Sequence, residues 1–171
     1  MKLLAELTDK SLGLSDVEDF VGPHSVRRSA RVVLFNDAGE VAFQKIERDG
    51  HAKLPGGGID EGESIEEGLR REVREEVGCE IAIGEPIGMV MEYRSEMKVL
   101  RISYAYLAHI DGELGEPKLE PIEIEEGLVP IWVKPEEALR LLDESSLDIY
   151  KVNFIVERDR LILKEALKLR G

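Results

Sequence analysis

The chain has 171 residues and a formal net charge of −13, from 36 acidic and 23 basic residues. This charge argues against a long nucleic acid as partner, because such binding is driven by basic surfaces that release counterions. Hydrophobic residues make up 43% of the chain and charged residues 35%, which is typical of a globular protein, and no apolar run is long enough to span a membrane.

The length predicts a single domain over residues 1–171, since no repeat, low-complexity tract or linker divides the chain. Residues 1–24 are a less patterned lead-in that ends at Gly22 and Pro23. Acidic residues interrupt what would have to be the apolar core of a signal peptide in this lead-in. We therefore expect a cytoplasmic protein that does not bind membranes.

The middle of the chain is rich in predicted strands, and its end is rich in predicted helices. Apolar and polar residues alternate on both sides of the turn-forming sequence NDAG, which predicts a β-hairpin. Helical periodicity follows a glycine run and returns near the C-terminus. This order implies mixed α/β layers in one domain. The predicted strands cover residues 29–35, 40–47, 79–93, 98–110 and 129–133, and the predicted helices cover 64–77, 135–143 and 146–169.

The helix behind the glycine run carries many carboxylates. Ser64 and Glu67 have the spacing of a capping box, so the helix is expected to begin just after Ser64. At helical spacing, Glu72, Glu75 and Glu76 share one face, where like charges repel one another. A bound divalent cation would offset this repulsion. An apolar stripe beside the acidic face is expected to pack on the sheet, and it comprises Ile65, Leu69, Val73 and Val77.

The glycine run PGGG, at residues 55–58, supplies backbone carbonyls that can approach a ligand closely. Carboxylate and carbonyl oxygens suit Mg²⁺ or Mn²⁺ better than zinc. Gly68 lies on the carboxylate face and is expected to leave space for a ligand near Glu72. Arg71 is spaced to pair with the acidic residue four positions before it or after it.

Acidic helix faces are more often solvated surface than binding sites. The solvated-surface interpretation is less suitable for Glu72, Glu75 and Glu76. The glycine run, a small residue and an apolar stripe are all expected to lie next to these three carboxylates. Cys79 has no partner for a disulfide or a zinc site, and we expect a small buried apolar side chain there. The solvated-surface interpretation is preferred for Asp60, Glu61, Glu66 and Glu67.

This segment resembles the Nudix box, G-x5-E-x7-R-E-U-x-E-E-x-G-U, where U is a bulky aliphatic residue. The one departure is Cys79 at the last aliphatic position. The KLPGGGI entry and the long terminal helix also resemble a little-characterised bacterial subgroup of that family. The fixed positions of the box, which spans residues 57–79, are filled by Gly57, Glu63, Arg71, Glu72, Val73, Glu75, Glu76 and Gly78.

The resemblance covers roughly residues 25–143. It implies the family's α/β/α sandwich with a mixed β-sheet, here with a long C-terminal helix at 146–169. It also implies a pyrophosphohydrolase that uses Mg²⁺, for which Mn²⁺ can substitute. By position, Glu72 and Glu76 would be the principal metal ligands, with Glu75 as a further ligand. The carbonyl of Gly57 would complete the set, and Glu63 and Arg71 would orient the loop and the helix.

The base that takes a proton from the attacking water varies in position within this family. Glu75 and Glu76 are candidates inside the box, and Glu126 is the candidate outside it, because EEGLVPIW resembles an arrangement in nucleotide-sanitising members. Glu123 and Glu125 compete with Glu126. All three could equally be an acidic loop.

Arg28 and Lys53 are the preferred candidates for binding substrate phosphates, although each could be solvated charge at a strand edge. Arg31, Lys45 and Arg94 are weaker candidates of the same kind. His51 and Ala52 stand where many family members have an aromatic residue for stacking a base, and His51 is expected to be an exposed loop residue.

The expected substrate is a small nucleotide in which a nucleoside diphosphate is linked to another group, with a modified nucleoside triphosphate preferred. ADP-ribose or another nucleotide sugar is the alternative, although the downstream markers of the ADP-ribose and diadenosine polyphosphate hydrolases are missing. A non-catalytic Nudix-fold module that binds a nucleotide as a regulatory ligand is a second hypothesis. The C-terminal helix or the lead-in could support a homodimer.

Overall fold

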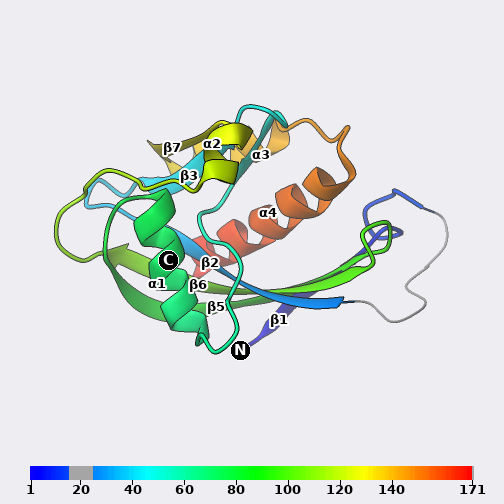
Figure 1. Ribbon diagram of the computed structural model, residues 1–171, viewed down its shortest axis with the longest axis horizontal. Coiled ribbons are helices and arrows are strands. Elements are labelled where there is room, and N and C mark those ends of the chain that lie inside the picture. The colour runs from blue at the N-terminus through cyan, green and yellow to red at the C-terminus, as the bar shows by residue number, and fades with distance from the viewer. Residues whose placement is uncertain (16–24, 171) are drawn as a thin grey trace.

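A mixed sheet with helices on both of its faces forms the body of the protein (Figure 1). The computed structural model describes residues 1–15 and 25–170. Over these residues the sheet has the strand order β1-β5-β6-β2-β3-β4, and β7 pairs with β3 as well. The strands are β1 (Leu3–Thr8), β2 (Ser25–Phe35), β3 (Val41–Ile46), β4 (His51–Lys53), β5 (Ile81–Arg94), β6 (Val99–Ile110) and β7 (Leu128–Val133), and the helices are α1 (Ile65–Glu76), α2 (Pro121–Glu126), α3 (Pro135–Asp143) and α4 (Tyr150–Arg170).

The side chains of β2 divide the core into two clusters, because successive strand residues point to opposite faces of a sheet. Val33 and Phe35 belong to the cluster that includes Phe154, Ile162 and Leu163 of α4. The alternate residues of β2 join the apolar stripe of α1 on the other face, in a cluster that includes Ala30, Val32, Leu34, Leu69, Val73 and Val77. The predicted sandwich, its mixed sheet and the long C-terminal helix are therefore confirmed.

The predicted hairpin is present but opens almost at once. β2 and β3 are in antiparallel register at Phe35 and Val41, whereas β2 runs parallel to β6 along its whole length. The glycine loop, residues 55–58, pairs with the edge of β2 that β3 leaves free. The N–H of Val32 donates to the carbonyl of Pro55 at 3.2 Å, and the N–H of Ala30 donates to the carbonyl of Gly57 at 3.0 Å. The opening between β2 and β3 thus admits the loop that precedes α1.

Several elements differ from the sequence-based expectation. The lead-in contains β1, which pairs in parallel with β5, whereas its expected end at Gly22 and Pro23 lies outside the described residues. Strand β4 and helix α2 were not predicted. Helix α4 begins at Tyr150 rather than at residue 146. In the described ranges, no helix is both long enough and apolar enough to cross a membrane.

Candidate metal and phosphate site

Helix α1 begins where the sequence predicts. Ser64 is the N-cap, and its side chain accepts a hydrogen bond from the N–H of Glu67 at 3.2 Å. The Glu67 carboxylate returns the contact by accepting from the N–H of Ser64 at 2.8 Å, which completes the capping box. The helix is thereby set in a rotation that buries Leu69 and Val73 and turns the three carboxylates toward the glycine loop.

Glu76 is the most deeply buried of these carboxylates, with 1% of its surface exposed. One oxygen accepts a 2.6 Å hydrogen bond from the N–H of Gly56, and the other lies 3.2 Å from the Lys53 ammonium. A buried carboxylate needs such partners to stay ionised. Glu76 therefore ties the end of α1 to the loop and to β4.

Glu72 lies directly against Gly57. A Cβ atom at position 57 would overlap both oxygens of the Glu72 carboxylate. Gly57 has no left-handed backbone angle, so it is the space that requires glycine here, not the conformation. Its carbonyl accepts from Ala30 and retains a second lone pair. The proximity of Glu72 to Gly57 fits the two ligands that the family resemblance implies.

Arg71 organises the rest of the site. Its guanidinium donates to Glu63 at 2.9 and 3.1 Å, to Glu72 at 2.9 Å, to Glu75 at 3.2 Å and to the carbonyl of Gly58 at 2.9 Å. The expected i,i+4 partner is thus Glu75 and not Glu67, which serves the capping box instead. Arg71 therefore holds the loop and the helix together.

Gly68 does not have the role that the sequence predicts for it. A Cβ atom at position 68 would contact Glu63 at 3.0 Å and Ile59 at 3.4 Å, and it would not meet Glu72. The missing side chain therefore admits the loop residues Ile59 and Glu63 against the helix. It does not clear a path for a ligand to Glu72.

The site carries more negative charge than its cations offset. Burial, followed by the charge of Glu76, raises the pKa of Glu72. Burial and the nearby charge of Glu76 raise the pKa of Glu123 on α2 to about 7, which places the Glu123 carboxyl close to the Glu76 carboxylate. A divalent cation would stabilise the ionised forms of Glu72 and Glu123. The oxygen donors present are those that Mg²⁺ prefers.

The carboxylates are not gathered around one point. In the part of the chain that the structure describes, no three His, Cys, Asp or Glu side chains form a ready coordination group. The Arg71 guanidinium pairs with both Glu72 and Glu75, and the Lys53 ammonium pairs with one oxygen of Glu76. The donor set fits a divalent cation, and binding would require these carboxylates to exchange their contacts with Arg71 and Lys53.

Of the three acidic residues considered outside the box, Glu123, Glu125 and Glu126, the structure places two in different surroundings. Glu126 pairs with Arg48 at 2.6 Å and lies 3.6 Å from Lys151, and no contact joins it to the box carboxylates. Glu123, its competitor in the sequence, is the one that meets Glu76. Both lie on α2 with a spacing of three residues, which places them on neighbouring sides of a helix. Helical periodicity could therefore not have told them apart.

The basic candidates also differ in position. Lys53 contacts the site through Glu76, and Arg28 is exposed at the start of β2, with its guanidinium 5.9 Å from the centre of the Tyr104 ring. Arg31 and Arg94, expected at a solvated edge, are only 5% and 3% exposed. Lys45 remains exposed.

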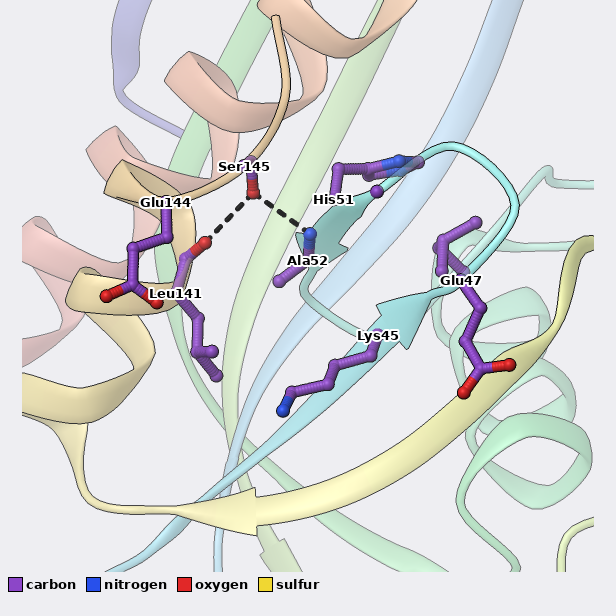
Figure 2. A pocket seen from close by; sticks show the side chains of 9 residues that line it. Lys45, Glu47, His51, Ala52, Leu141, Glu144 and Ser145 are labelled. Carbon is purple, nitrogen blue, oxygen red and sulfur yellow. Dashed lines mark hydrogen bonds between the residues drawn. The ribbon is translucent and has the colours of Figure 1, made fainter.

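His51 is buried on β4 and is not an exposed loop residue. It lines a cavity of about 240 Å³ between β3, β4 and α3, together with Lys45 and Glu144. Figure 2 shows this cavity, in which the Ser145 hydroxyl donates to the carbonyl of Leu141 and accepts from the N–H of Ala52. No box residue lines it.

The fold resembles several solved structures. The ORF135 protein of E. coli is 22% identical, with a TM-score of 0.58, over 88% of this chain and 96% of that one. A NUDIX hydrolase from Nitrosomonas europaea is 17% identical, with a TM-score of 0.63, over 84% and 90%. The Ap4A hydrolase of C. elegans is 18% identical, with a TM-score of 0.55, over 85% and 99%. At these identities the likeness shows the fold.

A search of curated proteins found no match. The family model for the NUDIX domain matches residues 25–152, which include the hairpin strands, the glycine loop, the box and α2. This match covers most of the chain and confirms the family that the box residues indicated. The chain belongs to the Nudix hydrolase family.

Proposed function

We propose that the protein is a divalent-metal-dependent pyrophosphohydrolase that cleaves a nucleoside diphosphate linked to another group. The observation that carries this proposal is the arrangement of Glu72 against Gly57 and of Glu76 against Gly56. These contacts hold two box carboxylates at the glycine loop, in a place that membership of the family assigns to metal and phosphate. The preferred substrate class is a nucleoside triphosphate, including modified ones.

Glu72, Glu76 and Glu75 would hold Mg²⁺, with the Gly57 carbonyl as a further oxygen ligand. Bound there, Mg²⁺ would neutralise diphosphate charge and polarise the reacting phosphorus. Arg71 keeps the Glu72 and Glu75 side chains at the loop through its contacts with Glu63 and Gly58. Its guanidinium also offsets the repulsion between the carboxylates while no cation is present.

Glu123 is the proposed general base. Its carboxyl reaches the Glu76 carboxylate from α2, outside the box helix, so it can contact a water on the loop side of the site. Glu75 and Glu76 remain candidates within the box. Glu126 is disfavoured by its ion pairs with Arg48 and Lys151.

Lys53 is proposed to contact a substrate phosphate. Its side chain is only 17% exposed, and its ammonium lies 3.2 Å from Glu76, at the edge of the loop. Once Glu76 binds a cation, Lys53 would lose part of its attraction to that carboxylate and could turn to a phosphate oxygen.

A hydrolysis screen tests this proposal. Purified protein is incubated with Mg²⁺ or with EDTA and with nucleoside triphosphates, oxidised nucleoside triphosphates, ADP-ribose, nucleotide sugars and dinucleoside polyphosphates. Phosphate release is measured with added pyrophosphatase or phosphatase. We expect Mg²⁺-dependent turnover of at least one class. Nucleotide binding without any turnover would instead support the regulatory module.

A further inference from the structure

A layer of buried charge lies between α4 and the sheet. Glu92 of β5 accepts from Arg94 at 2.7 Å and lies 3.7 Å from Arg158. Arg158 also donates to Asp159 at 2.7 and 3.0 Å, and Asp159 accepts from the N–H of Leu54 at 2.9 Å. These two carboxylates and two guanidiniums offset one another, so the layer has no spare acid.

Two more arginines adjoin this layer, and no carboxylate of the described residues lies within ion-pair distance of either. Arg31 is 5% exposed and makes one hydrogen bond, from Nη1 to the carbonyl of Ala30 at 3.3 Å, and its Nε has no partner. Arg101 stands opposite Glu92 in the β5–β6 register, but the Glu92 oxygens serve Arg94 and Arg158. Within the described residues, no ion pair reaches Arg101, and its Nε is buried without a partner.

Both guanidiniums are charged at neutral pH. Burial, and then the charge of Arg158, lowers the pKa of Arg31 to about 10. Burial, and then the charges of Arg31, Arg94 and Arg158, lowers the pKa of Arg101 to about 9. Buried charges in proteins are normally paired. Asp159, Glu76 and Glu72 act on Arg31, and Glu92 acts on Arg101, only through their more distant charge. Among the described residues no carboxylate forms an ion pair with either guanidinium, which leaves both open to a bound anion.

Arg101 opens onto a cavity that adjoins the candidate site. The cavity has a volume of about 490 Å³, and its wall includes Arg27, Arg28 and Arg101 from the strands and Gly58 and Asp60 from the glycine loop. Arg27 is the register partner of Arg101 on β2, which places two like charges side by side. Of the described residues that line this wall, three are arginines and one, Asp60, is acidic.

The glycine loop, which forms part of this wall, is also held by residues of the candidate metal site. Arg71 donates to the Gly58 carbonyl, and through its other nitrogens it holds Glu72 and Glu75. A substrate whose diphosphate lies at the box carboxylates could therefore extend along the loop into this cavity.

We propose that the cavity lined by Arg27, Arg28 and Arg101 binds a phosphate group of the substrate that lies outside the cleaved diphosphate. Guanidinium groups match the geometry of phosphate oxygens and form charge-assisted hydrogen bonds with them. This inference rests on the proposed function and narrows its substrate class. It favours substrates with a further phosphate over nucleotide sugars whose second group is uncharged.

Binding of tripolyphosphate in EDTA tests the cavity apart from catalysis. Isothermal titration calorimetry would compare wild type with Arg101→Gln, and with Arg140→Gln as control, because Arg140 lies on the exposed side of α3 and pairs with Glu137 and Glu144. We expect Arg101→Gln to weaken binding by about 10-fold or more and Arg140→Gln to leave it unchanged. Equal binding by wild type and Arg101→Gln, or no binding by wild type, would overturn the proposal.

Thermal unfolding separates this role from a structural one. An arginine that only stabilises the fold would lower the melting temperature when replaced, whereas removal of an unpaired buried charge should raise it or leave it unchanged. Arg101→Lys keeps the charge but loses the planar guanidinium. It replaces Arg101→Gln in the binding experiment if the glutamine variant does not fold. We expect it to bind tripolyphosphate more weakly than wild type, and equal binding would count against the cavity.

Kinetics on matched substrates show whether the bound anion belongs to the substrate. Arg101→Gln should raise KM for a nucleoside triphosphate and leave KM for ADP-ribose unchanged. If neither KM changes, the assignment to the substrate is wrong. If wild type and variants hydrolyse none of these substrates but wild type still binds tripolyphosphate, the proposed function is refuted. The proposal of an anion-binding cavity would remain supported.

Discussion

The Glu76 carboxylate accepts a 2.6 Å hydrogen bond from the backbone N–H of Gly56. Gly56 has φ of +120°, and a Cβ atom there would overlap the Ala30 carbonyl. The loop is therefore held between β2 and α1 where a side chain at position 56 has no room. One hydrogen bond thus couples the last turn of the box helix to the sheet, and it sets the distance between Glu76 and the loop.

Gly57→Ala should weaken divalent-metal binding, because the new methyl group would push the Glu72 carboxylate away from the loop. Gly58→Ala is the matched control, since a Cβ atom there meets nothing within 4 Å and neither glycine has a left-handed backbone angle. We expect the affinity for Mn²⁺, measured by calorimetry, to fall about 10-fold or more in Gly57→Ala only. Equal affinities in the two variants would show that Glu72 is not a ligand.

Glu123→Gln should lower kcat by about 10²-fold or more if Glu123 is the general base. Glu126→Gln should leave kcat near the wild-type value, since Glu126 faces Arg48 and Lys151. Both variants would be compared at saturating substrate and Mg²⁺. The opposite result, with kcat lost in Glu126→Gln alone, would restore the base that the sequence indicated.

The stability of the metal-free protein should depend on pH through Glu123. Its folded-state pKa of about 7 lies above the ordinary value of 4.5, so between these values the unfolded state binds fewer protons and stability falls as pH rises. The stabilisation is fully present below pH 4.5 and is lost as pH passes 7. Urea denaturation in EDTA at pH 5 and pH 8 would measure it.

The control for this pH effect is Glu123→Gln, which cannot titrate at position 123. Because other groups also titrate in this range, the informative quantity is the loss of stability from pH 5 to pH 8 in wild type minus that in the variant. We expect a positive difference in EDTA and a smaller one in Mg²⁺. A zero difference in EDTA would show that Glu123 does not approach Glu76 in solution.

Cys79 should resist thiol reagents in the folded protein. The side chain is 3% exposed, and burial, followed by the charge of Glu80, raises the pKa of the thiol to about 11. At pH 8 only about one thiol in a thousand would be ionised, and it would not be reachable. Dithionitrobenzoate should therefore react only when urea unfolds the chain, and fast reaction without urea would contradict this burial.

Local sequence signals predicted α1 well. The capping box, the apolar stripe and the shared face of Glu72 and Glu76 all depend on residues within a few turns of one another, and each is present in the structure. The packing of Cys79 follows the same logic. Such features can be derived from a single sequence because their partners lie nearby in the chain.

Long-range pairing was not predictable in the same way. Strand β1 pairs with Met89 to Tyr93 across most of the domain, and nothing in its own six residues identifies that partner. The alternation of isoleucine and glutamate in PIEIEE resembles a strand, although proline at its first position and Gly127 after its end favour the short helix α2. The partners of Glu123 and Glu126 come from other parts of the chain, Glu76 for the first and Arg48 and Lys151 for the second.

The positions of three arginines could not be predicted from the sequence alone. Arg31, Arg94 and Arg101 lie on strands, where a charged residue in a sequence normally indicates the solvent side. They lie instead on the face covered by α4, where Arg94 pairs with Glu92 and the charge of Arg158 acts on Arg31 and Arg101. The pairing of β2 and β5 with β6, together with the packing of α4 on β2 and β5, brings these residues together.

The central claim is that the box carboxylates support metal-dependent hydrolysis, and the most direct measurement is turnover by Glu76→Gln. Glutamine retains an oxygen that can accept from the Gly56 N–H, so the variant should keep the fold while it loses the charge that a cation requires. On the substrate found in the screen, with Mg²⁺, we predict a loss in kcat of about 100-fold or more at an unchanged melting temperature. Wild-type turnover in a folded Glu76→Gln variant would contradict the account.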